Sequence, residues 1–290
     1  MGRDETISGM KDLLRREVAR FCRGDDRHWK GPVVQTIREL REAGWRSVFF
    51  GGTLRSLLIS RLWHRRPGRP RDIDIVIRDM EVPRIREQFK RHLARETRFG
   101  GLQLRRMDWQ FDMWPLDRTW ALVEDRTADP GFDDLPRTTF FNLEAVAVEV
   151  WSLRGHGRLI YSGDDQFFGG ILDRVVEVNR EDNPFPGLCV VRALLLASGL
   201  DFRIGPRLSR YISEHGTGLS PGHFEEIQAK HYGKVRQAGA IMRCWTRHVA
   251  DASSDEVDRG VRLPILRQAT FWPDGNLDPT YVDVEIRRGG

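Results

Sequence analysis

The sequence predicts an α/β domain followed by a helical domain, and two observations lead to this prediction. Between residues 45 and 115, the periodicity of the apolar residues changes in the order strand, helix, strand, helix, strand, strand. From residue 188 onward the periodicity is helical, and this change follows the proline-containing segment REDNPFPG. We therefore predict three parts: an N-terminal helical extension over 1–44, an α/β domain over 45–182 and a helical domain over 183–290.

The individual elements follow from apolar spacing and from turn residues. An apolar stripe predicts a helix over 10–22, and a second helix over 33–43 is expected to end at Gly44, a residue suited to a helix C-terminus. WRSVFF is predicted to be a strand, GG its turn, and TLRSLLISRLW a helix capped by Thr53. RRPGRPR reads as a loop and DIDIVI as a strand. The remaining expected elements are a helix over 82–95, strands GLQLRRM and WQFDMW, a loop over 124–137, strand-like TTFFNLEAVAVEV and ILDRVVEVN, and the helices LCVVRALLLASGL, PRLSRYISEH and HFEEIQAKHYGKVRQAGAIMRCW.

The composition narrows the class of protein. Hydrophobic residues make up 40% and charged residues 31% of the 290 positions, which is enough apolar mass for a packed core. A formal charge of +5 leans mildly toward polyanionic partners. The three cysteines, Cys22, Cys189 and Cys244, lie far apart and the histidines form no cluster, which argues against structural zinc and suits a reducing compartment. Without an apolar run of membrane-spanning length, we expect a cytoplasmic protein with no membrane partner.

The strand DIDIVI carries two carboxylates on one face. Alternation sends Asp72, Asp74 and Val76 to one side and the three isoleucines to the other. Two charged, desolvated carboxylates one pleat apart repel each other, and a divalent cation relieves the repulsion. Oxygen ligands favour Mg²⁺ or Mn²⁺. The alternative is a solvent-facing strand with two ordinary aspartates.

Two neighbouring features give this pair of aspartates a chemical context. FFGG ends a strand at Gly51 and Gly52, where backbone N–H groups at a helix start can approach phosphate oxygens, although tight turns also need glycine for backbone reasons alone. WQFDMW places Asp112 on the face opposite Trp109 and its apolar neighbours. Three carboxylates on neighbouring strands beside a glycine turn are what two-metal phosphoryl transfer requires.

The order of several motifs resembles a known family. GGTLRSLL…RDIDIVI resembles the signature of the DNA polymerase β superfamily of nucleotidyltransferases, in particular the head of the bacterial (class II) CCA-adding enzyme and poly(A) polymerase family, GGxVRDxLLG…DxDxV. RFGGLQL…FDMWPLDRTW stands where that family has its third-carboxylate strand, and RTTFFNLEA resembles RRDFTINAMA. VVRALLLASGLDFRI resembles LRAxRFAxxLGFxI, the helix that begins the neck. The resemblance covers residues 45–205 in the correct order.

The resemblance implies a fold, a reaction and a set of residues. The fold would be an α/β (α+β) nucleotidyltransferase head with a mixed sheet, followed by a helical neck domain. The reaction would transfer NMP from NTP to a hydroxyl and release pyrophosphate. Asp72 and Asp74 would bind both Mg²⁺ (or Mn²⁺) ions, and Asp112 would complete the catalytic metal site. The nucleotide-binding residues would be Gly51, Gly52, Arg55, Arg137, Asn142 and Arg192.

The departures from the family pattern concern the recognition of the base. Ser56 replaces an aspartate, and Thr138 replaces the aspartate expected near the ribose. The family's base-reading EDxxR appears here as Phe185, Pro186 and Cys189. The protein template that selects C and then A is therefore not expected, and an ordinary CCA-adding enzyme is not the preferred interpretation.

The acceptor is expected to be an RNA 3′ end, with tRNA favoured, because the family and a basic loop both point to it. A toxin-like or defence-type enzyme that acts on tRNA, a protein or a small molecule is one alternative. A catalytically silent head that grips nucleic acid or a partner is another, and no regulatory protein partner is identifiable. The loop arginines that could bind RNA, with a solvated loop as the alternative, are Arg61, Arg65, Arg66, Arg69 and Arg71.

Overall fold

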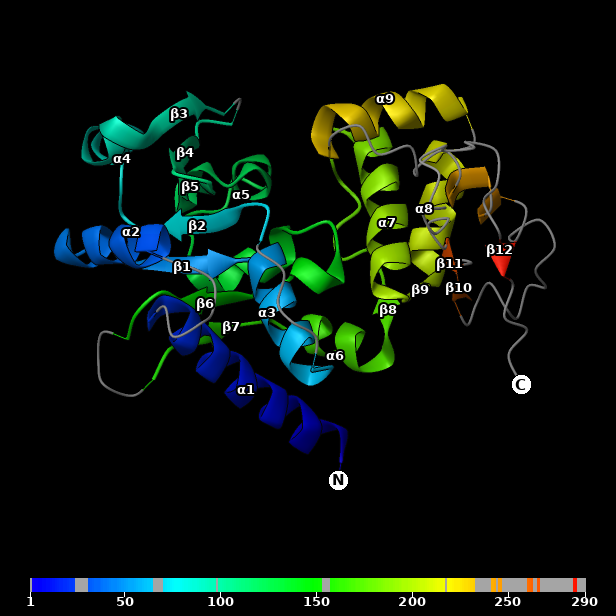
Figure 1. Cartoon of the computed structure of the whole chain (residues 1–290), viewed down its shortest axis with the longest axis horizontal. Helices are drawn as coiled ribbons and strands as arrows, with labels where there is room; N and C mark the ends of the chain where they lie inside the picture. The colour runs from blue at the N-terminus through cyan, green and yellow to red at the C-terminus, as the bar shows by residue number, and fades with distance from the viewer. Residues whose placement is uncertain are drawn as a thin grey trace, which may run out of the picture. The chain divides into compact units, whose positions relative to one another are not determined.

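The computed structural model divides into two compact units, residues 1–171 and 172–290 (Figure 1). Each unit is described separately below. The structure describes residues 2–23, 31–64, 70–97, 99–152, 157–216, 218–232, 241–243, 245–246, 260–262, 265–266 and 284–285.

The first unit is built around a seven-stranded sheet of order β3-β4-β5-β2-β1-β6-β7. Its strands are β1 (Ser47–Phe50), β2 (Ile73–Ile77), β3 (Leu93–Glu96), β4 (Leu102–Arg106), β5 (Trp109–Pro115), β6 (Ala147–Glu149) and β7 (Ile160–Tyr161). Only β2 and β5 pair in parallel within this sheet, and the other neighbouring strands are antiparallel. The predicted mixed sheet is therefore confirmed.

Two helices of this unit precede the first strand, and the others lie between or after the strands along the chain. The α-helices are α1 (Arg3–Arg23), α2 (Gly31–Glu42), α3 (Gly52–Leu62), α4 (Val82–Phe89), α5 (Trp120–Glu124) and α6 (Gln166–Asp173), whose last residues enter the second unit. The 3₁₀ helices are η1 (Lys90–His92), η2 (Leu116–Arg118), η3 (Phe132–Thr138) and η4 (Asn142–Glu144).

One face of the sheet is covered by helices and is called the helical face here. Alternation places the isoleucines of β2 and Phe111 of β5 on it, all of them buried. Phe21 of α1 packs edge-on against Phe49 and Trp109, with ring centroids 5.9 and 6.4 Å apart. Helix α1 also runs beside α3 (Figure 1). The predicted N-terminal helical extension thus contributes to the core of the same unit as the sheet.

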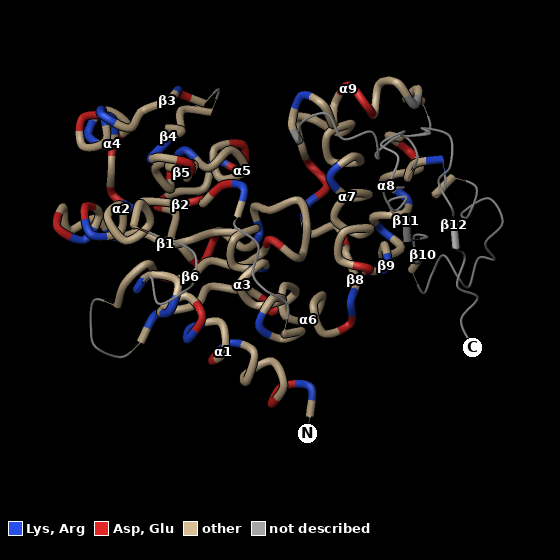
Figure 2. Tube along the Cα trace, in the orientation of Figure 1, with Lys and Arg blue, Asp and Glu red and all other residues tan. Residues whose placement is uncertain are grey.

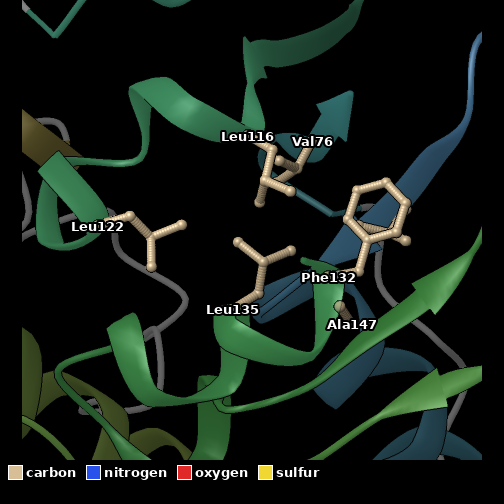
Figure 3. Packing of buried hydrophobic residues seen from close by; sticks show 7 residues of the cluster. Val76, Leu116, Leu122, Phe132, Leu135 and Ala147 are labelled. Atoms are coloured by element: carbon tan, nitrogen blue, oxygen red, sulfur yellow. The ribbon is translucent and has the colours of Figure 1, made fainter. Parts of the chain in front are cut away.

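The opposite face, called the site face here, is half covered. A buried cluster joins side chains of the central strands to the segments that follow β5 (Figure 3). Phe50, Trp114 and Tyr161 pack against this cluster and are only partly buried. The apolar cover therefore ends beside these rings. The cluster consists of Val48, Val76, Leu116, Leu122, Phe132, Leu135 and Ala147.

The predicted end of the second helix is confirmed in detail. Gly44 has a φ of 72°. The Gly44 N–H donates to the Arg41 carbonyl at 3.0 Å, and the Trp45 N–H donates to the Leu40 carbonyl at 3.1 Å. This pair of bonds defines a Schellman motif, which requires a residue that tolerates positive φ.

Several expected elements differ from the structure. The helix expected over 82–95 ends at Phe89, because the residues after η1 join the sheet edge as β3. Within TTFFNLEAVAVEV, Thr138 ends η3, 142–144 forms η4, and only 147–149 forms a strand. ILDRVVEVN begins inside α6 and contains only the short strand β8 (Val175–Val176). For 93–96, pairing with β4 overrides the local helical pattern.

The second unit is mainly helical where it is described. It contains α7 (Pro186–Leu200), α8 (Pro206–Gly216) and α9 (Pro221–Tyr232), with a small sheet of β8, β9 (Arg203–Ile204) and β10 (Val261–Arg262); β11 (Ile265–Leu266) and β12 (Val284–Glu285) pair separately. Glu177 accepts hydrogen bonds from the backbone N–H groups of Arg207 and Leu208 and so caps α8. None of the helices in the described parts of the chain is long and apolar enough to cross a membrane.

Candidate active site

Two of the three predicted carboxylates face each other across neighbouring strands. In the parallel β2–β5 pair, Asp74 is the register partner of Asp112. Their buried neighbours, Ile73 and Ile75 on β2 and Phe111 on β5, point to the helical face. Alternation therefore sends both carboxylates to the site face, as the sequence pattern predicts.

The third carboxylate, Asp72, lies just before β2 and is tied to the start of α3. The Thr53 hydroxyl donates to the Asp72 carbonyl at 3.0 Å. The sequence predicted Thr53 as the N-cap of its helix, and this prediction is wrong, because the N-cap is Gly51. The hydrogen bond instead joins the start of α3, next to the glycine turn, to the backbone of the first aspartate, and the Thr53 side of this contact is buried.

The Asp112 carboxyl lies in an environment with opposing electrostatic effects. Burial raises the pKa of Asp112 above its ordinary value. A hydrogen bond from Gln103 Nε2 to Asp112 Oδ1, 3.0 Å long, lowers the pKa, and the charge of Asp72 raises it. A hydrogen bond from Gln110 and the charge of Arg95 lower it. The Asp72 carboxylate therefore contributes to the electrostatic environment of Asp112.

Gln103 is a residue of the site that the motif comparison did not single out. It lies on β4, in register with Asp112, and its amide holds one oxygen of that carboxylate. A signal was present in GLQLRRM, where alternation places the polar Gln103 between two leucines. The pairing of β4 with β5 could not be read from that segment alone.

The donor set fits a divalent cation, although the side chains are turned to other partners. Three carboxylates on one face supply the oxygen ligands that Mg²⁺ prefers. Asp72 Oδ2, however, forms an ion pair with Arg71 Nη2 at 2.7 Å, and Asp112 accepts a hydrogen bond from Gln103. Within the described residues, no group of three or more His, Cys, Asp or Glu side chains is arranged to hold a metal ion. Cation binding by all three carboxylates would therefore require side-chain rotation.

The glycine turn adjoins Asp74 on the side away from β5. Phe50, the last residue of β1, is the register partner of Asp74, and Gly51 follows it directly. Gly51 has a φ of 66°, which disfavours any other residue. Its carbonyl accepts the N–H groups of Leu54 and Arg55 at 3.1 and 3.3 Å, which begins α3. The first N–H groups of a helix lack intrahelical partners and attract anions.

The chain can now be compared with known proteins. No protein-family model matches it, and no curated protein sequence matches it. Solved structures do match. A Thermotoga maritima CCA-adding enzyme complexed with tRNA is 17% identical, with a TM-score of 0.54 over 79% of this chain and 53% of that one. A CCA-adding enzyme with CTP is 20% identical, with a TM-score of 0.53 over 83% and 55%. A tRNA-processing enzyme is 16% identical, with a TM-score of 0.52 over 74% and 56%.

The chain has the fold of the CCA-adding enzymes. It spans little more than half the length of each of these solved chains. The resemblance suggested by the sequence motifs is thus confirmed for the fold, and the head and neck of these enzymes provide the frame for the remaining predicted residues.

Arg55, predicted to assist the triphosphate, is engaged within the head. Arg55 Nη1 lies 3.3 Å from Glu144 Oε1 in η4, and both side chains are more than four-fifths buried. Glu144 is a partner that the motif comparison did not identify. The pair joins the start of α3 to η4, so the guanidinium is held beside the glycine turn but already carries a counter-ion.

Asn142 is a buried residue that organises the same corner of the head. Only 5% of it is exposed, and its Oδ1 accepts the N–H of Leu143 at 2.9 Å. A side chain at Gly170 of α6 would overlap the Asn142 amide. The Asn142 side chain therefore packs between η4 and α6. Its predicted contact with a nucleotide stays a prediction.

Replacing Gly170 with alanine is expected to destabilise the protein by roughly 1–3 kcal/mol, because the added methyl overpacks a buried contact. Urea unfolding followed by circular dichroism measures the change. Gly199→Ala is the matched control, since a Cβ there meets no atom within 4 Å. Equal stability of the two variants would show that the Asn142 side chain moves without cost.

The other predicted contact residues are dispersed. Arg137 is about half exposed; it pairs with Asp134 at 3.0 Å and donates to Thr127. Arg192 lies on α7 of the second unit. Of the arginines predicted to contact RNA, Arg61 lies in the last turn of α3 rather than in the loop, 3.6 Å from Glu17, and Arg71 pairs with Asp72. Arg65, Arg66 and Arg69 lie outside the described residues.

Proposed function

We propose that this chain is a metal-dependent nucleotidyltransferase that transfers NMP from NTP to a hydroxyl acceptor and releases pyrophosphate. One observation carries the proposal: Asp74 and Asp112 lie in direct register on the site face, beside the glycine turn at Gly51. This arrangement belongs to a chain with the fold of the CCA-adding enzymes.

Asp72, Asp74 and Asp112 would hold Mg²⁺ or Mn²⁺. Such ions, when bound, lower the pKa of the attacking hydroxyl and stabilise the leaving pyrophosphate. The protein's own contribution is placement. Strand register sets the spacing of Asp74 and Asp112, Thr53 anchors the backbone of Asp72, and Gln103 orients Asp112.

The glycine turn would admit the triphosphate. Gly51 and Gly52 present backbone without a Cβ, so phosphate oxygens can approach the N–H groups at the start of α3. Arg55 would add a positive charge there once its pairing with Glu144 is shared or released. Arg137, Asn142 and Arg192 remain proposed members of the nucleotide pocket.

An RNA 3′ end, with tRNA favoured, is the proposed acceptor. The support is structural: among the matching solved structures is a CCA-adding enzyme complexed with tRNA. Selection of the base must differ from that family, because Phe185, Pro186 and Cys189 replace its base-reading residues. In this chain Phe185 is 39% exposed at the start of α7, whereas Cys189 is buried.

One observation favours a second candidate, a catalytically silent head that binds nucleic acid or a partner. The Arg71 guanidinium already neutralises Asp72 through contacts of 2.7 and 3.0 Å. Arg71 is 59% exposed, however, and an exposed ion pair of this kind is worth only about 0–1 kcal/mol. A divalent cation can therefore displace it.

A transfer assay tests the proposal. Each of the four α-labelled NTPs is incubated with the protein, Mg²⁺ or Mn²⁺, and total cellular RNA that retains residual protein. We expect label in tRNA-sized RNA from one or more NTPs, and complete loss of label with EDTA or in the Asp72→Ala/Asp74→Ala variant. Label in a protein band would instead indicate the toxin-like or defence-type alternative. No label, from a folded protein that retains RNA on a filter, would support the silent head.

A further inference from the structure

A row of register partners crosses four neighbouring strands on the site face. It runs from Arg95 on β3 through Gln103 on β4 to Asp112 and Asp74. A neighbouring pair, Arg105 on β4 and Gln110 on β5, lies one pleat away from Gln103 and Asp112 on the same face. The edge of the sheet beside the carboxylates is therefore basic and polar, and we call Arg95, Gln103 and Arg105 the β3–β4 lane. Figure 2 shows the basic positions on these two strands.

An irregularity in β3 brings Arg95 to this face. The register shifts between Leu93, which pairs with Leu104, and Arg95, which pairs with Gln103. Without the extra residue, Arg95 would oppose Leu102 and point to the helical face. Bulges of this kind often re-aim a side chain next to an active site.

The two arginines of the lane lack a counter-ion within the described part of the chain. Both are exposed, and neither forms an ion pair with any residue that the structure describes. Nearby arginines differ: Arg86 pairs with Glu96, and Arg106 pairs with Glu39.

Two anionic ligands could bind the lane, the triphosphate of the NTP or the backbone of the RNA acceptor, and the position of the lane relative to the glycine turn favours the acceptor. The sheet order places β1 and its glycine turn on one side of β2, and β5, β4 and β3 on the other. In phosphoryl transfer, the attacking and leaving oxygens lie roughly in line on opposite sides of the phosphorus. With the triphosphate at the glycine turn, we expect an in-line acceptor on the far side of the carboxylates, where the β3–β4 lane lies.

We propose that the β3–β4 lane binds the phosphodiester backbone of a single-stranded RNA acceptor, with Arg95 and Arg105 as phosphate contacts. This inference rests on the proposed nucleotidyl transfer and adds the surface that receives the acceptor. Guanidinium groups suit phosphate because they present several N–H donors in a planar fork. Contacts to the backbone position a strand without reading its sequence.

The salt dependence of RNA binding tests the lane. A fluorescently labelled single-stranded RNA is titrated with the full chain at several KCl concentrations. Loss of two phosphate contacts is expected to reduce the slope of log K against log [KCl] by about 1.4, at about 0.7 per contact on single strands. We expect this change in Arg95→Ala/Arg105→Ala, together with a several-fold higher KM for RNA and an unchanged KM for NTP. Arg95→Lys/Arg105→Lys should retain most of the slope, because it keeps both charges.

The matched control removes two arginines from the other side of the sheet. Arg16 on α1 and Arg38 on α2 are exposed, and neither forms an ion pair with a residue that the structure describes. Arg16→Ala/Arg38→Ala makes the same change in net charge and should leave the slope as in the unmodified chain. Equal slopes in both double variants would contradict RNA binding by the lane, and so would an unchanged KM for RNA in the lane variant. Neither result would contradict the proposed nucleotidyl transfer. If the unmodified chain transfers no nucleotide, but its salt dependence of RNA binding still changes in the lane variant, the proposed function would be overturned. RNA binding by the lane would then still hold.

Discussion

Replacing Asp112 with asparagine is expected to reduce nucleotidyl transfer at least ~100-fold, because a carboxylate that holds a catalytic cation supports several kcal/mol of transition-state stabilisation. Folding should be little affected. Asparagine keeps the shape of the side chain and an oxygen that can still accept the hydrogen bond from Gln103. Asp74→Asn should behave in the same way, since Asp74 is the register partner of Asp112.

Two measurements distinguish loss of chemistry from loss of structure. Thermal unfolding should give a Tm close to that of the unmodified chain, and Mn²⁺ binding, followed by electron paramagnetic resonance with NTP present, should weaken. Asp117→Asn is the matched control, because Asp117 is exposed on η2 five residues further along. Full transfer by Asp112→Asn would remove Asp112 from the metal site.

Replacing Glu39 with alanine is expected to destabilise the first unit by about 3 kcal/mol, the lower end of the ~3–5 kcal/mol that follows when a buried ion pair loses one partner. Arg106 is the buried partner, with 6% of its side chain exposed, and its Nη2 lies 2.9 and 2.7 Å from the two Glu39 oxygens. Its Nη1 is also buried and has no hydrogen-bond partner among the described residues. Glu39 is 34% exposed, which is the reason for taking the lower end.

A double variant isolates the charge as the cause. Arg106→Met removes the buried cation and leaves a partly exposed carboxylate that water can solvate, so it should cost less than Glu39→Ala. In urea unfolding, Glu39→Ala/Arg106→Met should therefore be more stable than Glu39→Ala alone. If the double variant were the less stable of the two, the contribution of Arg106 would come from packing rather than from its paired charge.

The positions of the carboxylates show which features of the site can be predicted from the sequence. Alternation in DIDIVI and WQFDMW determines which residues share a face, because side-chain direction repeats every two residues within any strand. Those two segments therefore predicted that Asp74 and Asp112 leave the apolar side of their strands, and the structure confirms it. Gly44 was also predictable, since a left-handed helix end is a local requirement.

Other features depended on partners far away in the sequence. The residues after Phe89 continue a helical pattern locally, yet they complete the sheet edge as β3 because β4 offers unpaired backbone groups there. Thr53 looks like a helix cap, but its hydroxyl binds the carbonyl of Asp72 once the two segments are brought together.

The sequence by itself determined the order of β1, α3 and β2, the strand face of Asp74 and Asp112, and the resemblance to the CCA-adding fold. Only the tertiary structure decided that Asp74 stands opposite Asp112, that Gln103 holds Asp112 and that a bulge turns Arg95 toward them. The physical reason is that periodicity is a property of one strand, whereas register is a property of two. A shift of one residue in pairing would have placed each of these side chains against a different neighbour.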